Sequence, residues 1–226
     1  MLLVLFTAIL PILVLASPDA TDVPDPKTIT LRSVDLEGDG CPPDSTKFKY
    51  AGNGINWSAY YAGFQANLWW NATAANAGRK ICDATFDVGV PAGWQVTLDR
   101  VQSSYTASVR PGVRAWIESS FAISGNATEV SHDSGYWPAA TGLLTVTKPV
   151  RHLVFRGPIN GEGSSTFDYN SDGVYSECGK NTKLTLTNVF RLWLDNESIA
   201  QNNGSIPSES LTTLEEQRGF FAWRRC

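Results

Sequence analysis

The sequence predicts an all-β protein, an antiparallel β-sandwich of the jelly-roll type that is stapled by disulfides and contains little helix. Apolar and polar residues alternate with period two along most of the 226 residues, as expected for strands with one buried face. Turn sequences rich in Gly, Pro and Asn separate about ten such runs. Because no helical segments lie between the runs, an antiparallel sandwich is favoured over an α/β fold.

The N-terminal stretch MLLVLFTAILPILVLA is predicted to be a signal peptide covering residues 1–16. Its apolar run is too short for a comfortable membrane span, and the small residues Val14 and Ala16 suit cleavage after Ala16. Residues 17–26 are then expected to form a flexible leader, and residues 27–226 a single β-sandwich domain. We expect a secreted, extracellular protein without a membrane anchor.

In the first half of the chain, alternation is clearest around the second cysteine. Residues 81–90 would place Cys82, Ala84, Phe86, Val88 and Val90 on one face and Asp83, Thr85 and Asp87 on the other. After a Pro-Ala-Gly turn, the alternation continues in residues 93–101. Further strands are predicted at 27–34, 46–50, 63–70 and 104–109.

In the second half, the longest alternating run is residues 183–195, whose inward face would carry Leu184, Leu186, Asn188, Phe190, Leu192 and Leu194. Other strands are predicted at 113–123, 142–147, 150–156 and 219–226. A capping-box pattern in Thr212 and Glu215 predicts one or two helical turns. Residues 196–210 are predicted to form a polar loop.

The four cysteines are Cys41, Cys82, Cys178 and Cys226, an even number that predicts two disulfides in an exported protein. A zinc site is disfavoured because the chain has no C-x-x-C spacing and its two histidines are isolated. Four cysteines allow three connectivities. We favour Cys41 with Cys82 and Cys178 with Cys226, which would each close a loop of roughly forty to fifty residues and contribute about 3–4 kcal/mol.

Five N-x-[ST] sequons predict a glycoprotein, at Asn56, Asn71, Asn126, Asn196 and Asn203. Asn56 is the least favoured because the bulky Trp57 occupies the middle position. The formal charge of −4 and the absence of basic clusters larger than Arg79-Lys80 and Arg224-Arg225 argue against nucleic acid as a partner. The expected partner is a glycan or a protein, and the oligomeric state is left open.

Two stretches resemble the first half of a calcium loop, in which oxygen ligands alternate before a glycine. One contains Asp168, Asn170, Asp172 and Gly173, and the other Asp35, Glu37, Asp39 and Gly40. Neither has an acidic residue at the twelfth position, where Gly179 and Thr46 stand. Ordinary turn chemistry is therefore the favoured interpretation, with calcium as the weaker alternative, and no cofactor is expected.

Six segments occur in an order that resembles domain-of-unknown-function family 4360, a family of secreted fungal proteins. They are GDGCPPDS (38–45), RKICDATFDVGVPAGW (79–94), YTASVRPGVRAWIESSFAISG (105–125), RGP (156–158), ECGKNTKLTLTN (177–188) and FFAWRRC (220–226). All four cysteines fall on the family's cysteine positions. The resemblance covers about residues 29–226 and implies a secreted, disulfide-stapled β-sandwich of fungal origin, with no catalytic residue to transfer. The chain departs from the pattern in its acidic residues before Cys41.

No catalytic residue is assigned from the sequence. Glycoside hydrolysis needs two carboxyl groups about 5–10 Å apart, and the candidate pairs are Asp83 with Asp87, Asp99 with Glu118, and Asp168 with Asp172. A solvated strand face explains Asp83 and Asp87 equally well. No G-x-S-x-G elbow accompanies His132, and His152 is expected to be a partly buried ring within a strand. A polysaccharide-active hydrolase is the alternative function.

Aromatic residues are densest in NWSAYYAGFQANLWWN, residues 56–71. Neighbouring residues of a strand point to opposite faces, so Trp69 and Trp70 cannot both be buried against one core. Trp57, Trp69 and Trp70 are the candidate residues for stacking on a ligand, and a rim tryptophan shielded by a loop is the competing explanation. The favoured function is a non-catalytic extracellular binding or cell-surface protein.

Overall fold

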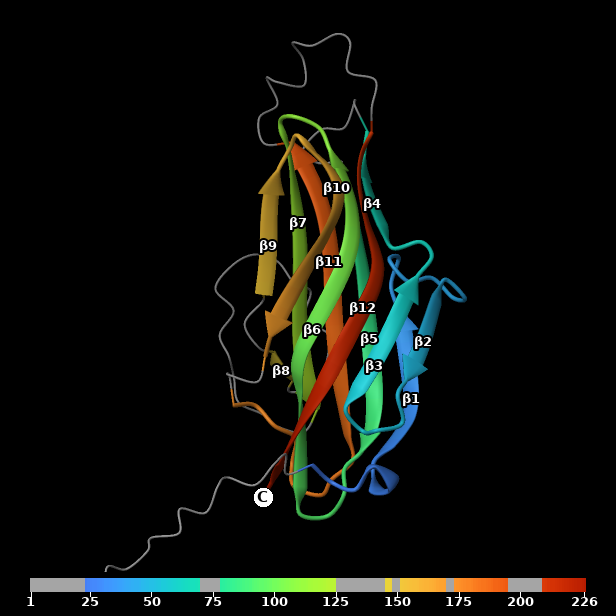
Figure 1. The fold of residues 1–226 in the computed structure, drawn as a ribbon, viewed down its shortest axis with the longest axis vertical. Helices are drawn as coiled ribbons and strands as arrows, with labels where there is room; N and C mark the ends of the chain where they lie inside the picture. The colour runs from blue at the N-terminus through green and yellow to red at the C-terminus, as the bar shows by residue number, and fades with distance from the viewer. Residues whose placement is uncertain (1–22, 70–77, 125–144, 148–150, 170–172, 195–208) are drawn as a thin grey trace, which may run out of the picture.

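A computed structural model describes residues 23–69, 78–124, 145–147, 151–169, 173–194 and 209–226. These residues form two antiparallel sheets that pack face to face, with β6 and β12 crossing in front of β7 and β11 in Figure 1. The strands run close to the long axis of the molecule. The predicted antiparallel β-sandwich is confirmed.

Each sheet has six strands, and all pairs are antiparallel. Sheet A has the order β1 (Thr30–Glu37), β5 (Arg79–Gly89), β11 (Thr182–Leu194), β7 (Val113–Ser124) and β8 (Thr145–Thr147), and β9 (Arg151–Arg156) also pairs with β7. Sheet B has the order β10 (Ile159–Asp168), β6 (Trp94–Val109), β12 (Ser210–Arg225), β3 (Asn56–Tyr61) and β2 (Thr46–Tyr50), and β4 (Gln65–Leu68) also pairs with β12. The short 3₁₀ helix η1 (Pro26–Thr28) precedes β1.

The predicted alternation places the expected side chains in the core. In β5, Cys82, Ala84, Phe86 and Val88 are buried, and in β11, Leu184, Leu186, Asn188, Phe190 and Leu192 are buried. The strands predicted at 93–101 and 104–109 are one continuous strand, β6. The sequence analysis did not predict β3 or β10. The residues of β10 are mostly exposed, polar or glycine, and show no apolar alternation.

The helical turns predicted around Thr212 and Glu215 are wrong, because both residues lie in β12. This strand begins at Ser210 rather than at residue 219, and it occupies the centre of sheet B. Ser210, Thr212 and Leu214 are buried at alternate positions, which is the spacing of a strand. Pairing with β6 on one side and with β3 and β4 on the other outweighs the local capping signal.

The interior is a single hydrophobic core, rich in aromatic rings, between the two sheets. Trp57 lies in it, with its ring 5.0 Å from that of Phe86 and 5.8 Å from that of Phe48. The ring lies directly on Gly219, where a Cβ atom would come within 2.0 Å of the indole. Val23, in the predicted leader, also packs against this core, whereas residues 25–28 are exposed.

A buried polar network joins the two sheets through the amides of Asn188 on β11 and Gln217 on β12. Asn188 Nδ2 donates to Gln217 Oε1 at 3.0 Å, and Gln217 Nε2 donates to Asn188 Oδ1 at 2.9 Å. Ser119 donates to Asn188, Gln217 also donates to Ser103, and Tyr61 donates to Gln217. Burial raises the pKa of Tyr61 well above its usual value, so its hydroxyl remains a donor. The network fixes how the sheets face each other.

The two disulfides are Cys41–Cys82 and Cys178–Cys226, so the favoured pairing is confirmed and the zinc alternative is excluded. Cys41 and Cys82 are buried beside sheet A. Cys178 and Cys226 are exposed, where the segment before β11 meets the end of β12. Each disulfide thus ties a connection between the two sheets to a strand, β5 in one case and the end of β12 in the other.

Several sequence predictions fall on residues outside the described part of the chain. These are the signal peptide and the sequons at Asn71, Asn126, Asn196 and Asn203. Asn56 is described and lies partly exposed on β3. Over the residues that the structure does describe, none of the helical structure has the length and apolar character of a membrane span.

Candidate functional site

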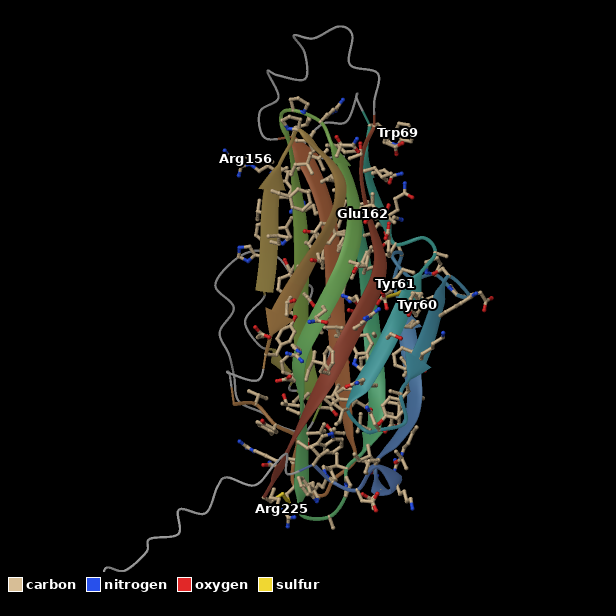
Figure 2. The ribbon with its side chains drawn as sticks, viewed as in Figure 1. Tyr60, Tyr61, Trp69, Arg156, Glu162 and Arg225 are labelled. Atoms are coloured by element: carbon tan, nitrogen blue, oxygen red, sulfur yellow. A yellow bond between two sulfur atoms is a disulfide. The ribbon has the colours of Figure 1, made fainter. Side chains whose placement is uncertain are left out.

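The outer face of sheet A carries cross-strand rows of side chains, because the pairing register aligns four strands. The first row is Arg156, Arg114 and Trp193, and the second is Val154, Trp116, Arg191 and Arg79. The third is His152, Glu118, Val189 and Ile81. We call these three rows the tryptophan–arginine face. It lies at the end of sheet A where β7 begins and β9 ends, which Figure 2 marks with Arg156.

Three aromatic rings meet on this face. The Trp116 and His152 rings are stacked, with centroids 4.4 Å apart and planes inclined by 16°. Trp193 lies on the other side of Trp116 at 5.9 Å, tilted by 50°. The rings come from β11, β7 and β9, one from each of the three rows, and form a diagonal line of roughly 10 Å at the usual strand spacing, which we call the aromatic row. The side chain of His152 is exposed, and those of Trp116 and Trp193 are half-buried.

Glu118 holds the central ring in place. Its Oε2 accepts a hydrogen bond from Trp116 Nε1 at 3.0 Å. Burial raises the pKa of this carboxyl, while the hydrogen bond from Trp116 and the neighbouring His152 and Arg79 side chains act in the opposite direction. The carboxyl group of Glu118 therefore orients the Trp116 ring.

Positive charge surrounds the aromatic row. The arginines of the face are Arg79, Arg114, Arg156 and Arg191, and Glu118 is the acidic side chain within these three rows of described residues. The Arg191 guanidinium lies 5.7 Å from the Trp193 ring, within the range of a cation–π contact. The whole chain has a formal charge of −4, so this face differs in sign from the protein as a whole.

Beyond the third row, the outer face of sheet A carries threonines and charged side chains in place of aromatic rings. The hydroxyls of Thr85 and Thr185 are 3.0 Å apart, and Thr187 donates to Asp83 at 2.5 Å. Asp83, Thr85 and Asp87 point outward as predicted. The two aspartates are four residues apart on one strand, hence about 13 Å apart by strand rise, which is too far for a hydrolytic pair.

The other predicted carboxylate pairs do not assemble among the described residues. Asp99 lies on β6 of sheet B, whereas Glu118 lies on the outer face of sheet A, so the core separates them. The pair of Asp99 and Glu118 is therefore wrong. Asp168 lies exposed on β10, and Asp172 falls outside the described residues. The hydrolase alternative has no located acid–base pair.

The calcium-loop patterns have different outcomes. Asp39 Oδ1 accepts from the backbone N–H of Ile81 at 2.8 Å, and its Oδ2 lies 3.3 Å from Lys80 Nζ. Gly38 has a φ of +119°, and a Cβ there would come within 2.3 Å of the Ile81 carbonyl oxygen. Residues 35–40 therefore end β1 in an ordinary turn. In the other pattern, Asn170 and Asp172 lie outside the described residues, and those described contain no group of three His, Cys, Asp or Glu that could hold a metal.

The predicted stacking residues Trp57 and Trp69 are not part of the three rows of the tryptophan–arginine face. Trp57 is only 2% exposed, so it belongs to the core and offers no surface to a ligand. Trp69 is 58% exposed just after β4, and its carbonyl oxygen accepts from Arg110 at 3.2 Å. Trp70 is outside the described residues. Trp69 stays a candidate for ligand stacking.

Sequence reasoning missed Trp116, Trp193 and His152. A signal was present, because Trp116 lies between Arg114 and Glu118 in strand spacing and Trp193 follows Arg191, so both tryptophans alternate with buried residues. The expectation of a partly buried His152 is wrong. Its ring is exposed and lies on Trp116, because it occupies an outward position of β9.

These observations define a disulfide-stapled, two-sheet antiparallel β-sandwich with an aromatic, positively charged outer face. The chain belongs to the family described as a domain of unknown function (DUF4360), which matches residues 27–226. A comparison with curated proteins finds no match. Among solved structures, the chain is similar to that of TmCBM61 in complex with β-1,4-galactotriose, with 10% identity and a TM-score of 0.25, over 92% of this chain and all of that one. A TM-score of this size carries no argument about function.

Proposed function

We propose that this protein is a secreted, non-catalytic β-sandwich that binds a glycan chain on the tryptophan–arginine face. The observation that carries the proposal is the row of His152, Trp116 and Trp193 across three neighbouring strands. The C–H groups on the face of a sugar ring pack well against flat aromatic rings. A row of such rings offers successive positions to the successive sugars of a chain.

Polar groups around the rings supply what sugar hydroxyls need. Arg191 and His152 can donate hydrogen bonds, and Glu118 can accept them. Glu118 also fixes the Trp116 ring through the bond from its indole nitrogen. A ring held in place before binding loses little conformational freedom when the ligand arrives. The face therefore combines apolar contact area with a few oriented polar groups, as ligand sites do.

Secretion and glycosylation are part of the same proposal. The two disulfides support an oxidising compartment, in which such bonds persist. The signal peptide at residues 1–16, cleavage after Ala16 and the glycans on the sequons follow from the sequence. Fungal origin is what the family resemblance implies. The intact mass of the exported protein, before and after enzymatic deglycosylation, tests cleavage and glycan number together.

The proposed function is tested by binding of the purified protein to immobilised chitin, glucan, cellulose, mannan, galactan and pectic polymers. The informative variant is Trp116→Ala, and its matched control is Phe220→Ala, which removes a half-buried ring from the outer face of sheet B. Loss of a central tryptophan should weaken binding by about 2 kcal/mol, or roughly thirtyfold. The control should bind like the parent protein.

Three outcomes would overturn the proposal. The first is no retention on any polymer, which would redirect the search to a protein ligand. The second is an equal loss in Trp116→Ala and Phe220→Ala. The third is loss in Trp69→Ala alone, which would move the site to the end of β4. Release of new reducing ends from any polymer would instead support the hydrolase alternative.

A further inference from the structure

We propose that the glycan is an acidic polysaccharide whose uronate carboxylates are bound by the arginines of the tryptophan–arginine face. This inference rests on the proposed function and names the ligand class of the same site. It is carried by the cross-strand arrangement of cations and rings.

The first argument is the local balance of charge. Among the described residues, the three rows of the face contain four arginines and one carboxylate, in a chain whose formal charge is −4. A positive region on an acidic protein is a local feature, since the net charge would by itself repel a polyanion. An acidic polymer is the partner that complements this region.

The second argument is the placement of the cations beside the rings. Arg191 lies directly across from Trp116 in the pairing of β11 with β7, and Arg114 lies directly across from Trp193. Each tryptophan thus has an arginine on the neighbouring strand at the usual spacing of about 5 Å. The carboxylate of a uronic acid projects from the edge of the sugar ring. A sugar stacked on either ring would direct that carboxylate toward a neighbouring strand.

The third argument is the chemistry of the cation. Arginine presents a planar fork of N–H donors that matches a carboxylate in a bidentate fashion, and such bonds are about twice as strong as neutral ones. All the permanent cations of the face are arginines. Arg191 already lies against the Trp193 ring, so part of its side-chain freedom is lost before binding.

The outer face of sheet B mixes the two signs of charge more closely. The cations Lys47, Lys49, Arg100, Arg218 and Arg224 share its strands with the acids Glu162, Asp168, Glu215 and Glu216. Arg218 Nε donates to Glu216 at 2.8 Å. Arg100 lies 4.5 Å from the Phe220 ring, in the same kind of contact that Arg191 makes with Trp193. Arg100 is therefore the matched control for Arg191.

The test is calorimetric titration with three versions of one oligosaccharide: an oligogalacturonate, the same oligomer with its carboxylates reduced to alcohols, and a sulfated neutral oligomer of equal length. The variants are Arg191→Gln and Arg100→Gln. We expect the oligogalacturonate to bind, carboxyl reduction to weaken binding about tenfold or more, and Arg191→Gln to weaken it by about tenfold. Arg100→Gln should bind like the parent, and added salt should weaken binding.

The comparison of ligands does not depend on any variant folding correctly. Equal affinity for the uronate and its reduced form, unaffected by salt, would overturn the inference and leave the proposed function standing. Preference for the sulfated oligomer over the uronate would also overturn it. Binding of none of the oligomers, nor of any polymer, would overturn the proposed function itself. An Arg191→Lys variant, which keeps the charge but not the fork, should fall between the parent and Arg191→Gln.

Discussion

The outer faces of sheets A and B are built from the same kinds of residue and yet form different surfaces. On both, an arginine lies against an aromatic ring, Arg191 on Trp193 and Arg100 on Phe220. On sheet A the register brings Trp116 between its aromatic neighbours, so the rings form a row. On sheet B, Phe220 faces Arg100 and Asn56 instead. Register, more than composition, decides whether the outward rings of neighbouring strands lie next to one another.

The carboxyl groups of the two faces differ in the same way. On sheet B, the hydrogen bond from Arg218 holds the pKa of Glu216 below its usual value. On sheet A, burial raises the pKa of Glu118, and its main hydrogen bond comes from a neutral indole. The Glu216 carboxylate thus has a cationic partner on its own strand, whereas the Glu118 carboxyl is half-buried against an indole. The difference separates a structural surface from a candidate binding surface.

The largest expected effect is the loss in the free energy of unfolding when a disulfide is removed, and it should differ between the two disulfides. Each closes a long loop, with sequence separations of 41 and 48, so removing either should cost about 4 kcal/mol. The double variant Cys41→Ser/Cys82→Ser also places hydroxyls in a buried site, which should add about 1–3 kcal/mol. Changing the exposed pair Cys178 and Cys226 to serine should cost only the free energy that is lost when the loop is opened. Urea unfolding followed by circular dichroism measures both losses.

Equal losses in the two double variants would contradict this comparison. A second measurement needs no mutation. Mild reductant applied to the folded protein, followed by alkylation and mass spectrometry, should open Cys178–Cys226 before Cys41–Cys82, because only the former is exposed to solvent.

The next largest effect concerns the amide pair that joins the two sheets. Asn188→Ala would leave the Gln217 amide with unmet hydrogen bonds in the core, and we expect a loss of about 3 kcal/mol in the free energy of unfolding. The control is Thr185→Ala on the outward side of the same strand, where the cost should stay near 1 kcal/mol. A loss in Asn188→Ala no larger than in the control would show that the network contributes little.

The smallest expected effects have opposite signs on the two faces. Burial raises the folded-state pKa of Glu118 above its unfolded value of 4.5, so the folded protein binds this proton more tightly than the unfolded chain does. Stability therefore falls as pH rises from the unfolded-state pKa through the folded-state pKa. At neutral pH, Glu118→Gln should therefore raise the free energy of unfolding by about 0.5 kcal/mol and shift the urea midpoint slightly upward. Below about pH 4 the variant and the parent should differ little.

The pKa of Glu216 is lowered, so its contribution is present above 4.5 and is lost as pH falls through the folded-state value. Glu216→Gln should therefore lower stability at neutral pH by about 0.5 kcal/mol and have little effect in acid. The paired measurement is the urea midpoint of both variants across pH. The same sign of change in the two variants would contradict the assignment.

Alternation along the sequence predicted the sandwich because burial on one side of a strand leaves a local trace. That trace placed Phe86 and Leu186 in the core and Asp83 outside it. It failed for β10, which is largely exposed, and for the start of β12, whose buried positions are occupied by the polar residues Ser210 and Thr212. These segments form strands because they pair with neighbouring strands, and the local sequence does not show which strands those are.

The candidate site was harder to predict for a related reason. Local density drew attention to Trp57, Trp69 and Trp70, which are near one another in sequence. The observed aromatic row draws His152, Trp116 and Trp193 from three distant segments. Only the pairing of β9 and β11 with β7 brings them together. A single sequence shows that each residue points outward, but not which residues it meets.

The place of β12 in sheet B has a consequence for the order in which the chain can fold. β12 lies between β6 and β3 and also supplies Gln217, yet it follows every other strand in the chain. While a ribosome is still synthesising the preceding residues, β6 and β3 have no common neighbour, and their edges stay open. Long-range pairing of this kind is slow to form. The sandwich can therefore close only after residues 210–225 have been synthesised, so the two sheets complete their pairing together at the end of synthesis.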